Sequence, residues 1–249
     1  MGRFDDRIVI VTGAGTGIGR ATALAFARSG ARVLSVGRRQ APLEQAAAEH
    51  PNIDIAAHDL RRENSAGTVI DAAVARWGRV DVLVNNAGAT TLMPLAEVTG
   101  ERVVDLFALN VVAPSLLAAA ALPHLRATGG SIVNVSSTYG HRPIPGAAHY
   151  SASKAALEQL TRSWALELAT EGVRVNAVAP GPTESEALSA AGLTDELVEQ
   201  IKREETERIP LRRRGIPAEI AEWVLHLSDP AASWITGQII TVDGGLELV

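Results

Sequence analysis

The sequence predicts a doubly wound α/β fold, in which helices cover both faces of a parallel β-sheet. Short runs of β-branched residues alternate with longer helical patterns along the chain. These runs are apolar at nearly every position, which is typical of parallel strands that are buried on both faces. No linker, repeat or low-complexity tract interrupts the alternation, so we expect a single domain over residues 1–249.

The first strand is expected at 8–11, and the helix after it is expected to end at Gly30. Six more runs have the composition of buried strands and lie at 32–36, 53–57, 80–86, 131–137, 173–180 and 239–245. Further helical patterns lie near 43–49, 64–77, 101–122, 151–171, 194–206 and 217–228. Helices between successive strands provide the crossovers that a parallel sheet requires.

Composition excludes several classes of protein. The net charge of −5 leaves no basic surface for nucleic acid or an anionic membrane. There is no cysteine, and no stretch of signal-peptide length precedes the first strand, so a cytoplasmic protein is expected. The apolar run 109–125 contains two prolines and is expected to be a buried helix, not a membrane span. His58, His141 and His149 lack metal-ligand spacing, so no metal is expected.

A glycine-rich loop, TGAGTGIGRA, joins the first strand to the first helix. Gly13, Gly17 and Gly19 would let the backbone turn sharply and approach a pyrophosphate, which free N–H groups at the helix N-terminus would bind. A tight turn without a ligand could use the same glycines. Their place after the first strand of an alternating pattern favours a dinucleotide.

Five further motifs accompany the T-G-x-x-x-G-x-G spacing of this loop. They are NNAG at 85–88, NVSS at 134–137, YSASK at 150–154, APG at 179–181 and ITGQIITVDGG at 235–245. With these motifs, nearly the whole chain resembles the short-chain dehydrogenase/reductase family. The resemblance implies a Rossmann-type fold, a nicotinamide cofactor and hydride transfer between a carbonyl and a secondary alcohol. The cofactor-binding residues that it implies are Gly13, Thr16, Gly17, Ile18, Gly19, Arg38, Asp59, Leu60, Asn86, Ala87, Gly88, Tyr150, Lys154, Pro180, Gly181, Thr183 and Ser185.

The end of the second strand indicates which nicotinamide cofactor to expect. NAD-using relatives carry an acidic residue there, whereas this chain has Gly37 followed by Arg38 and Arg39. Arg38 could pair with a 2′-phosphate, so NADP(H) is expected rather than NAD(H). Thr16 stands where many NADP-using relatives have a basic residue, and the two arginines could instead be solvated loop charges. The expectation therefore depends mainly on Arg38.

The resemblance also implies a set of catalytic residues. Tyr150 would be the general acid or base, and Lys154, one helical turn later, would hold the cofactor and favour the phenolate. Ser137 would orient the substrate oxygen, and Asn110 would kink its helix and hold a water beside the lysine. Ser136 is the rival of Ser137, because adjacent residues of a strand point to opposite faces.

The segment 183–208 is expected to form a lid over a small-molecule carbonyl or alcohol substrate. The pocket beneath it would have a mixed polar and apolar lining of Thr90, Thr138, Tyr139, His141, His149, Thr183 and Leu188. Two other classes of function stay open. One is a catalytically silent protein that senses the cofactor, and the other is an epimerase or dehydratase that retains it.

A 3-oxoacyl-carrier-protein reductase is a further alternative, since these relatives share the motif pattern. In them, basic residues flank the active-site entrance and bind the acidic carrier protein, whereas the matching positions here are Thr128 and Glu171. Arg126, Arg162 and Arg174 are nearby in the sequence and could compensate. We expect a free small molecule as the substrate.

A homotetramer is expected, because in relatives the helices that match 101–122 and 151–171 pair between subunits and TVDGG lies at a second interface. The apolar side chains of the second helix include Leu157, Leu160, Trp164 and Leu168. These side chains could instead pack on the sheet of their own chain.

Overall fold

The computed structural model describes residues 2–185 and 194–249. Within them the chain forms a seven-stranded sheet in the order β3-β2-β1-β4-β5-β6-β7. The strands are β1 (Ile8–Thr12), β2 (Arg32–Gly37), β3 (Ile53–Ala57), β4 (Val82–Asn85), β5 (Ser131–Val135), β6 (Arg174–Pro180) and β7 (Ile239–Val242). All neighbouring strands run parallel, and the strand order reverses beside β1, so the predicted doubly wound fold is confirmed.

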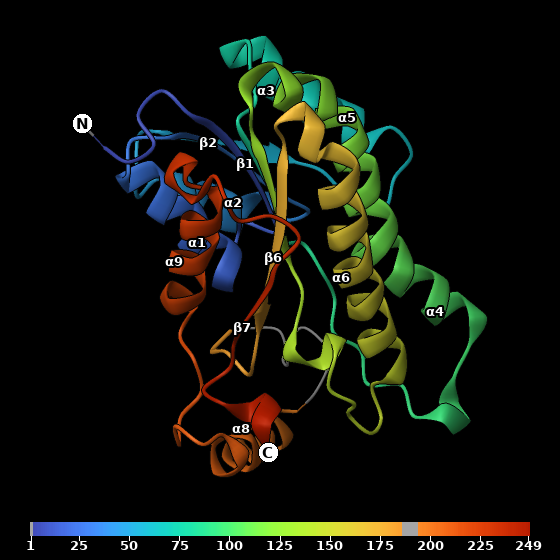
Figure 1. Cartoon of the computed structure of the whole chain (residues 1–249). Coiled ribbons are helices and arrows are strands. Elements are labelled where there is room, and N and C mark those ends of the chain that lie inside the picture. Colours follow the sequence, from blue (N-terminus) through green and yellow to red (C-terminus); the bar gives the residue numbers. More distant parts are fainter. Residues whose placement is uncertain (1, 186–193) are drawn as a thin grey trace.

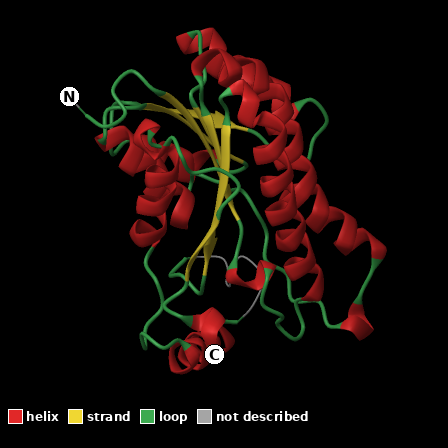
Figure 2. Ribbon diagram, in the orientation of Figure 1, coloured by secondary structure: helices red, strands yellow, loops and turns green. Residues whose placement is uncertain are grey.

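Helices cover both faces of this sheet, as Figure 1 and Figure 2 show. One layer consists of α1 (Gly17–Arg28), α2 (Gln40–Ala47) and α9 (Pro217–Ser228). The opposite layer consists of α3 (Ser65–Trp77), α4 (Gly100–Phe107), α5 (Ala113–Thr128) and α6 (Ala148–Leu168). Helix α8 (Asp195–Arg208) lies beyond the end of the sheet, near the C-terminus (Figure 1). Short 3₁₀ helices are η1 (Leu95–Glu97), η3 (Thr138–Gly140), η4 (Ala169–Glu171), η5 (Pro230–Ala232) and η6 (Leu246–Leu248).

The central strand β1 explains why the strands are apolar at most positions. Val9 and Val11 pack into the core beneath α1 and α9, whereas Ile10, between them, packs into the core beneath α3 and α5. All three side chains are fully buried. Both faces of the strand are therefore interior, which favours apolar side chains on both of them.

The helix expected at 101–122 is interrupted. A π-helical turn, η2 (Ala108–Val112), joins α4 to α5, and α5 continues to Thr128. By length and composition alone, the run Gly100–Thr128 could cross a membrane. Leu117, Ala121 and Leu125 are nevertheless buried in the chain's own core, which is where the apolar residues of a core helix belong.

Candidate active site

The glycine-rich loop lies at the carboxyl edge of the sheet, where β1 ends and α1 begins. Gly13 and Gly17 have φ values of +65° and +53°, in the left-handed region that favours glycine. A Cβ on Gly19 would overlap the carbonyl oxygen of Gly13 and the side-chain amide of Asn86. The loop therefore makes a tight turn that only glycines allow, and it leaves the N-terminus of α1 without side chains that would block an anion.

A cavity of about 620 Å³ opens beside this loop, within the usual size of a small-molecule site. It brings together predicted cofactor residues from five segments, namely Gly13, Thr16, Gly17, Ile18, Gly19, Arg38, Asp59, Leu60, Asn86, Ala87, Gly88 and Ser185. Thr90, which was predicted for the substrate pocket, lines the same cavity. The residues that line it do not include Tyr150 and Lys154 of α6, nor Pro180, Gly181 and Thr183 at and after the end of β6.

Three residues that were not predicted to bind the cofactor also line this cavity, namely Arg39, His58 and Arg61. Gly37 is paired with Ala57 across β2 and β3, so the residues that follow the two strands lie side by side. These residues could have been predicted from the sequence, because basic residues follow both of two strands that are expected to be neighbours in the sheet. Arg38, Arg39 and Arg61 bring guanidinium groups to this end of the cavity, beside the carboxylate of Asp59.

Thr12 joins the end of β1 to the NNAG segment. Its buried Oγ1 accepts hydrogen bonds from the backbone N–H groups of Asn86 and Ala87, at 3.0 Å each, and donates to the carbonyl of Val84 at 3.2 Å. The side-chain amide of Asn86 in turn donates to the carbonyl of Thr12 at 2.8 Å. One threonine therefore holds in place a segment that lines the cavity.

Tyr150 lies in the first turn of α6, where its hydroxyl meets the hydroxyls of Ser137 and Thr90. Burial raises the pKa of Tyr150 above its ordinary value, while hydrogen bonding to Ser137 and then to Thr90 opposes the rise. Ser137 is buried at the N-terminus of η3, and its Oγ accepts from the backbone N–H of Tyr139 at 3.2 Å. The structure thus brings the phenol and the serine hydroxyl together.

Lys154 is buried one turn after Tyr150, with its Nζ 6.0 Å from the centroid of the Tyr150 ring. Nζ donates to the carbonyl of Val135 at 2.9 Å. A Cβ on Gly88 would lie 3.3 Å from Nζ, so the ammonium group lies close to the NNAG segment. Burial lowers the pKa of Lys154 to about 8, although the charge of Glu158 opposes the fall.

Asn110 lies in the π-helical turn η2 and is buried. Its Oδ1 accepts from the backbone N–H of Ala89 at 2.9 Å, and its Nδ2 donates to the carbonyl of Ala89 and to Ser153 Oγ, at 3.0 Å each. The side chain therefore ties the helix break to the segment after NNAG and to α6. π-Helical turns of this kind occur frequently at functional sites.

Ser136, the rival of Ser137, is turned away from Tyr150. Its Oγ donates to Glu158 Oε1 at 2.9 Å and lies 3.4 Å from the carbonyl of Lys154. The sequence pattern did not indicate Glu158, although it continues the four-residue series of Tyr150 and Lys154 along α6. The geometry favours Ser137 as the hydroxyl that faces the phenol.

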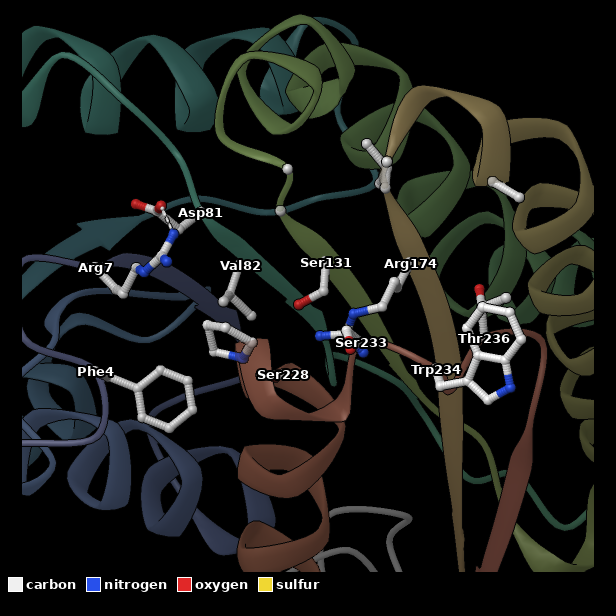
Figure 3. Close-up of a pocket in the computed structure, with 16 residues that line it drawn as sticks. Phe4, Arg7, Asp81, Val82, Ser131, Arg174, Ser228, Ser233, Trp234 and Thr236 are labelled. Carbon is white, nitrogen blue, oxygen red and sulfur yellow. Dashed lines mark hydrogen bonds and ion pairs between the residues drawn. The ribbon is translucent and has the colours of Figure 1, made fainter.

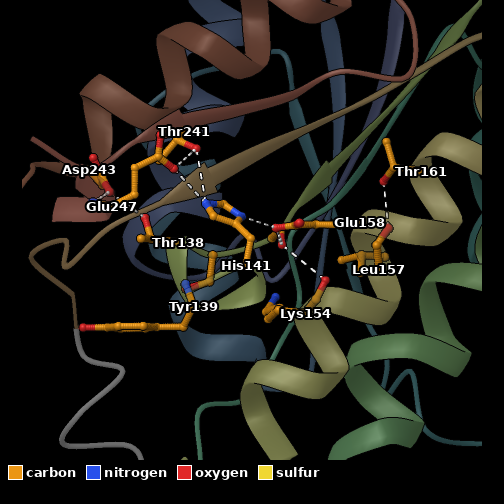
Figure 4. Close-up of polar contacts among 12 residues, drawn as sticks. Thr138, Tyr139, His141, Lys154, Leu157, Glu158, Thr161, Thr241, Asp243 and Glu247 are labelled. Atoms are coloured by element: carbon orange, nitrogen blue, oxygen red, sulfur yellow. Dashed lines mark hydrogen bonds and ion pairs between the residues drawn. The ribbon is translucent and has the colours of Figure 1, made fainter. Parts of the chain in front are cut away.

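His141, which was predicted to line the substrate pocket, contacts two carboxylates in the structure. Its Nδ1 lies 3.0 Å from Glu158 Oε1 and its Nε2 lies 2.9 Å from Glu247 Oε2, so the ring bridges two carboxylates (Figure 4). Burial would lower the pKa of His141, but hydrogen bonds and charge from Glu158, and then from Glu247, outweigh it and raise that pKa. The ring links the loop after β5 to the C-terminal segment.

The other residues predicted for the substrate pocket have different surroundings. Thr138 is fully buried, and its hydroxyl donates to Asp243 Oδ2 at 3.1 Å. Burial raises the pKa of Tyr139, and the charge of Arg208 opposes the rise. His149 Nδ1 is buried and has no hydrogen-bond partner in the described part of the chain. Leu188 and the lid segment 186–193 lie outside the described residues.

A second cavity, of about 440 Å³, lies at the opposite edge of the sheet, where β4, β5 and β6 begin (Figure 3). There Arg174 donates to the carbonyls of Leu227 and Asp229, at 2.7 and 3.0 Å, and so ties the start of β6 to the end of α9. Doubly wound sheets bind ligands outside the carboxyl ends of their strands. This cavity is therefore not part of the candidate active site.

The two positions compared with carrier-protein reductases also lie far from the site. Thr128 ends α5, and Glu171 follows α6 in η4, where Arg126 NH2 donates to its Oε1 at 2.7 Å. Between Tyr150 and Leu168, α6 rises by roughly 27 Å at about 1.5 Å per residue. Within one chain, then, Thr128 and Glu171 do not flank the entrance to the Tyr150 site.

Comparison with known proteins extends over the whole length of the chain. A family model described as enoyl-(acyl carrier protein) reductase matches residues 13–247. The chain is 36% identical to the 3-oxoacyl-[acyl-carrier-protein] reductase FabG of Thermotoga maritima, over 99% of this chain and 100% of the relative. It is 39% identical to an uncharacterized oxidoreductase of Mycobacterium tuberculosis, over 99% and 94% of the two chains. Glucose 1-dehydrogenase of Gluconobacter oxydans is 36% identical, with the same coverage.

Solved structures agree with the sequence relatives. A short-chain dehydrogenase/reductase of Caenorhabditis elegans, solved with cofactor, superimposes with a TM-score of 0.93 at 36% identity, over 99% of this chain and 97% of the other. One from Brucella melitensis, described as a glucose/ribitol dehydrogenase, gives 0.91 at 34% identity over 98% of both chains. Fold, glycine-rich loop and full-length similarity lead to one conclusion: the chain belongs to the short-chain dehydrogenase/reductase family of oxidoreductases.

Proposed function

We propose that the protein is an NADP(H)-dependent oxidoreductase that interconverts a carbonyl and a secondary alcohol on a free small molecule. One observation supports this most directly: the Tyr150 hydroxyl meets Ser137 beside the buried Lys154, whose ammonium group lies close to Gly88, a residue that lines the cavity. Carbonyl reduction needs a proton donor, a hydrogen bond to the oxygen and a nearby positive charge. Tyr150 offers the proton donor, Ser137 the hydrogen bond and Lys154 the positive charge.

The cavity suits a nicotinamide dinucleotide. Gly19 and Gly88 lack side chains where one would overlap the loop or crowd the ammonium group of Lys154. The first turn of α1 contains no acidic residue that would repel a pyrophosphate. Asp59 and Asn86 line the part of the cavity proposed for the adenosine half. When bound, the nicotinamide would supply or accept the hydride.

NADP(H) is the proposed cofactor, because positive charge gathers at the end of β2. Gly37 stands where a carboxylate would bind ribose hydroxyls, and Arg38, Arg39 and Arg61 line the cavity there. Arg61 Nε pairs with Asp105 at 2.9 Å, so we propose Arg38 as the partner of the 2′-phosphate. An exposed guanidinium can bind a 2′-phosphate through two parallel hydrogen bonds.

In the direction of reduction, Tyr150 donates its proton to the carbonyl oxygen of the substrate. Ser137 donates a hydrogen bond to the same oxygen and so orients it. The ammonium group of Lys154 then stabilises the phenolate that remains; with a pKa of about 8, this group is mostly charged at neutral pH. Oxidation of an alcohol uses the same groups in reverse.

A Tyr150→Phe variant tests this function. NADPH oxidation is measured against a panel of ketones and aldehydes, and NADPH binding is measured by fluorescence. General acid–base catalysis contributes about 10²- to 10⁴-fold, so turnover should fall at least about a hundredfold while binding stays nearly unchanged. A variant that keeps more than about a tenth of the turnover contradicts the role of Tyr150.

The same assays separate the alternative functions. A silent cofactor-sensing protein would bind NADPH without turnover in the wild type. An epimerase or dehydratase that retains its cofactor would convert its substrate without net loss of NADPH.

A free small molecule is proposed as substrate because the surface near Thr128 offers little positive charge to a carrier protein. Arg126, which could have compensated, is paired with Glu171, and Arg174 is engaged with backbone carbonyls. Because this surface is remote from the Tyr150 site of its own chain, it could serve only the site of another subunit. The similarity to FabG keeps the carrier-protein reductase as the competing proposal.

A homotetramer is also proposed. Leu157, Trp164 and Leu168, named from the sequence as interface candidates, pack against the core of their own chain instead. Other apolar side chains of α4, η2, α5 and α6 are exposed, namely Val104, Val112, Leu116 and Leu166. Such a surface is typical of a subunit interface. We further propose that residues 1–249 act as one cytoplasmic catalytic domain with 183–208 as its lid.

A further inference from the structure

Glu158 is a buried charged residue to which the mechanism above gives no task. It follows Tyr150 by two helical turns and Lys154 by one on the same face of α6, and it is 2% exposed. A carboxylate in the interior is costly unless it is paired and hydrogen-bonded. Its partners therefore indicate what it does.

Those partners come mainly from residues 136–141, here called the serine loop, which connects β5 to the segment before α6. Oε1 of Glu158 accepts from Ser136 Oγ at 2.9 Å and lies 3.0 Å from His141 Nδ1 (Figure 4). A Cβ on Gly140 would overlap the same oxygen. Both ends of the serine loop thus contact one oxygen atom, and its glycine makes room for that atom.

We propose that Glu158 is a positioning residue, which holds the serine loop against α6 so that Ser137 and not Ser136 faces Tyr150. This inference rests on the proposed function of the site. Ser136 and Ser137 are neighbours with the same hydroxyl, so a small rotation of the loop would exchange them. The hydrogen bond from Ser136 to Glu158 opposes that rotation, since the rotation would remove a hydrogen-bond donor from a buried carboxylate.

Glu158 also acts on the neighbouring turn of its own helix. Its negative charge raises the pKa of Lys154 against the effect of burial. The other charged groups around Glu158 are His141, from the serine loop, and Arg162, whose NH2 lies 3.9 Å from Oε2. Glu247, from the C-terminal segment, contacts His141 from its far side. Among these charges Glu158 is the carboxylate that acts on the ammonium group.

The test is Glu158→Gln, which keeps the shape of the side chain and removes its charge. Glu167→Gln, on the exposed side of the same helix, is the matched control. The steady-state assay uses NADPH with the ketone of the panel that the wild type reduces fastest. Urea unfolding and NADPH fluorescence show whether each variant folds and binds the cofactor.

We expect kcat of Glu158→Gln to fall roughly ten- to a hundredfold, as for a misplacement of about 1 Å, while NADPH binding changes little. The loss of activity at alkaline pH, where Lys154 loses its proton, should begin at lower pH than in the wild type. A residue that contributed only to stability would lower the urea midpoint without moving this pH profile. Ser136→Ala should lower kcat as well but leave the pH profile in place, because the charge of Glu158 is retained.

A folded Glu158→Gln variant with kcat within about twofold of the wild type and an unmoved alkaline limb overturns the inference. If that variant does not fold, Ser136→Ala decides: a lower kcat supports the positioning role, and an unchanged kcat overturns it. The Tyr150→Phe variant separates this outcome from a failure of the proposed function. If Tyr150→Phe stays active, the function itself is wrong; if it is inactive while Glu158→Gln and Ser136→Ala are fully active, only the role of Glu158 is lost.

Discussion

Thr12 gives the sharpest test of how the fold builds the cofactor cavity, because two substitutions separate its hydroxyl from its methyl group. Thr12→Val keeps the shape of the buried side chain but removes Oγ1. The backbone N–H groups of Asn86 and Ala87 then lose their acceptor, and Val84 loses a donor. Thr12→Ser keeps the oxygen and removes only the methyl group.

The contacts set the size of each effect. Each hydrogen bond contributes about 0.5–1.5 kcal/mol net, and the three share one oxygen atom, so Thr12→Val should cost about 2–3 kcal/mol. Thr12→Ser should cost about 1 kcal/mol, the value of one buried methyl group with its small cavity. For a chain of this size the valine variant should melt roughly 4–12 °C lower than the wild type. The segment that contains Asn86 and Ala87 lines the cavity, so the Kd of the valine variant for NADPH should rise roughly tenfold, equivalent to about 1.4 kcal/mol.

Urea unfolding followed by circular dichroism gives the stability order, and fluorescence titration gives the Kd for NADPH. The expected order is wild type, then Thr12→Ser, then Thr12→Val, with equal m-values. If packing of the methyl group were the main contribution, the order of the two variants would reverse. A valine variant that is as stable as the serine variant and binds NADPH normally would refute the reasoning.

Four further predictions concern the cofactor, pH, assembly and substrate. The kcat/KM should be higher with NADPH than with NADH, and Arg38→Asp should reverse the preference; equal values in the wild type would contradict this. The raised pKa of His141 contributes stability that is complete below about pH 6.5 and is lost as the pH rises through the folded-state pKa. Between about pH 6 and 8, the urea midpoint of the wild type should therefore fall more than that of His141→Asn. Parallel curves of urea midpoint against pH would contradict this prediction. Light scattering at micromolar concentration should give a tetramer mass, and a monomer mass would remove the proposed interface. A free acetoacetyl thioester should be reduced at least as well as acetoacetyl-carrier protein at low and moderate salt. A large, salt-sensitive preference for the carrier protein would instead support the carrier-protein reductase.

Most of the fold was predictable from local patterns, because strands buried on both faces leave an unbroken apolar run. The β1 prediction, 8–11, falls one residue short of Ile8–Thr12. The break of the long helix at η2 was predictable only as a kink at Asn110, and only through the family resemblance. A π-helical turn changes which carbonyl each N–H meets, and the composition of an apolar run does not record that choice.

The site was predictable where its residues share one element or one motif, and not where their partners are distant. Tyr150 and Lys154 are related by a helical turn, so their spacing alone places them on one face. His141 was predicted from the sequence as a pocket residue, but its contact with Glu247, 106 positions further along the chain, was not predictable. Thr138 is likewise bound by Asp243, 105 positions away. No local pattern reports contacts of this length.

The same reasoning explains why the serine side of the site needs a support that the tyrosine side does not. Backbone hydrogen bonds of α6 maintain the distance from Tyr150 to Lys154, so no further contact is required to set it. Ser137 lies in a loop whose backbone could turn either serine toward the phenol. Its orientation must therefore come from contacts across the fold, and the shortest route from the loop to the rigid helix is the hydrogen bond from Ser136 to Glu158. The helix that carries the phenol thus also carries the group that aligns the serine with it.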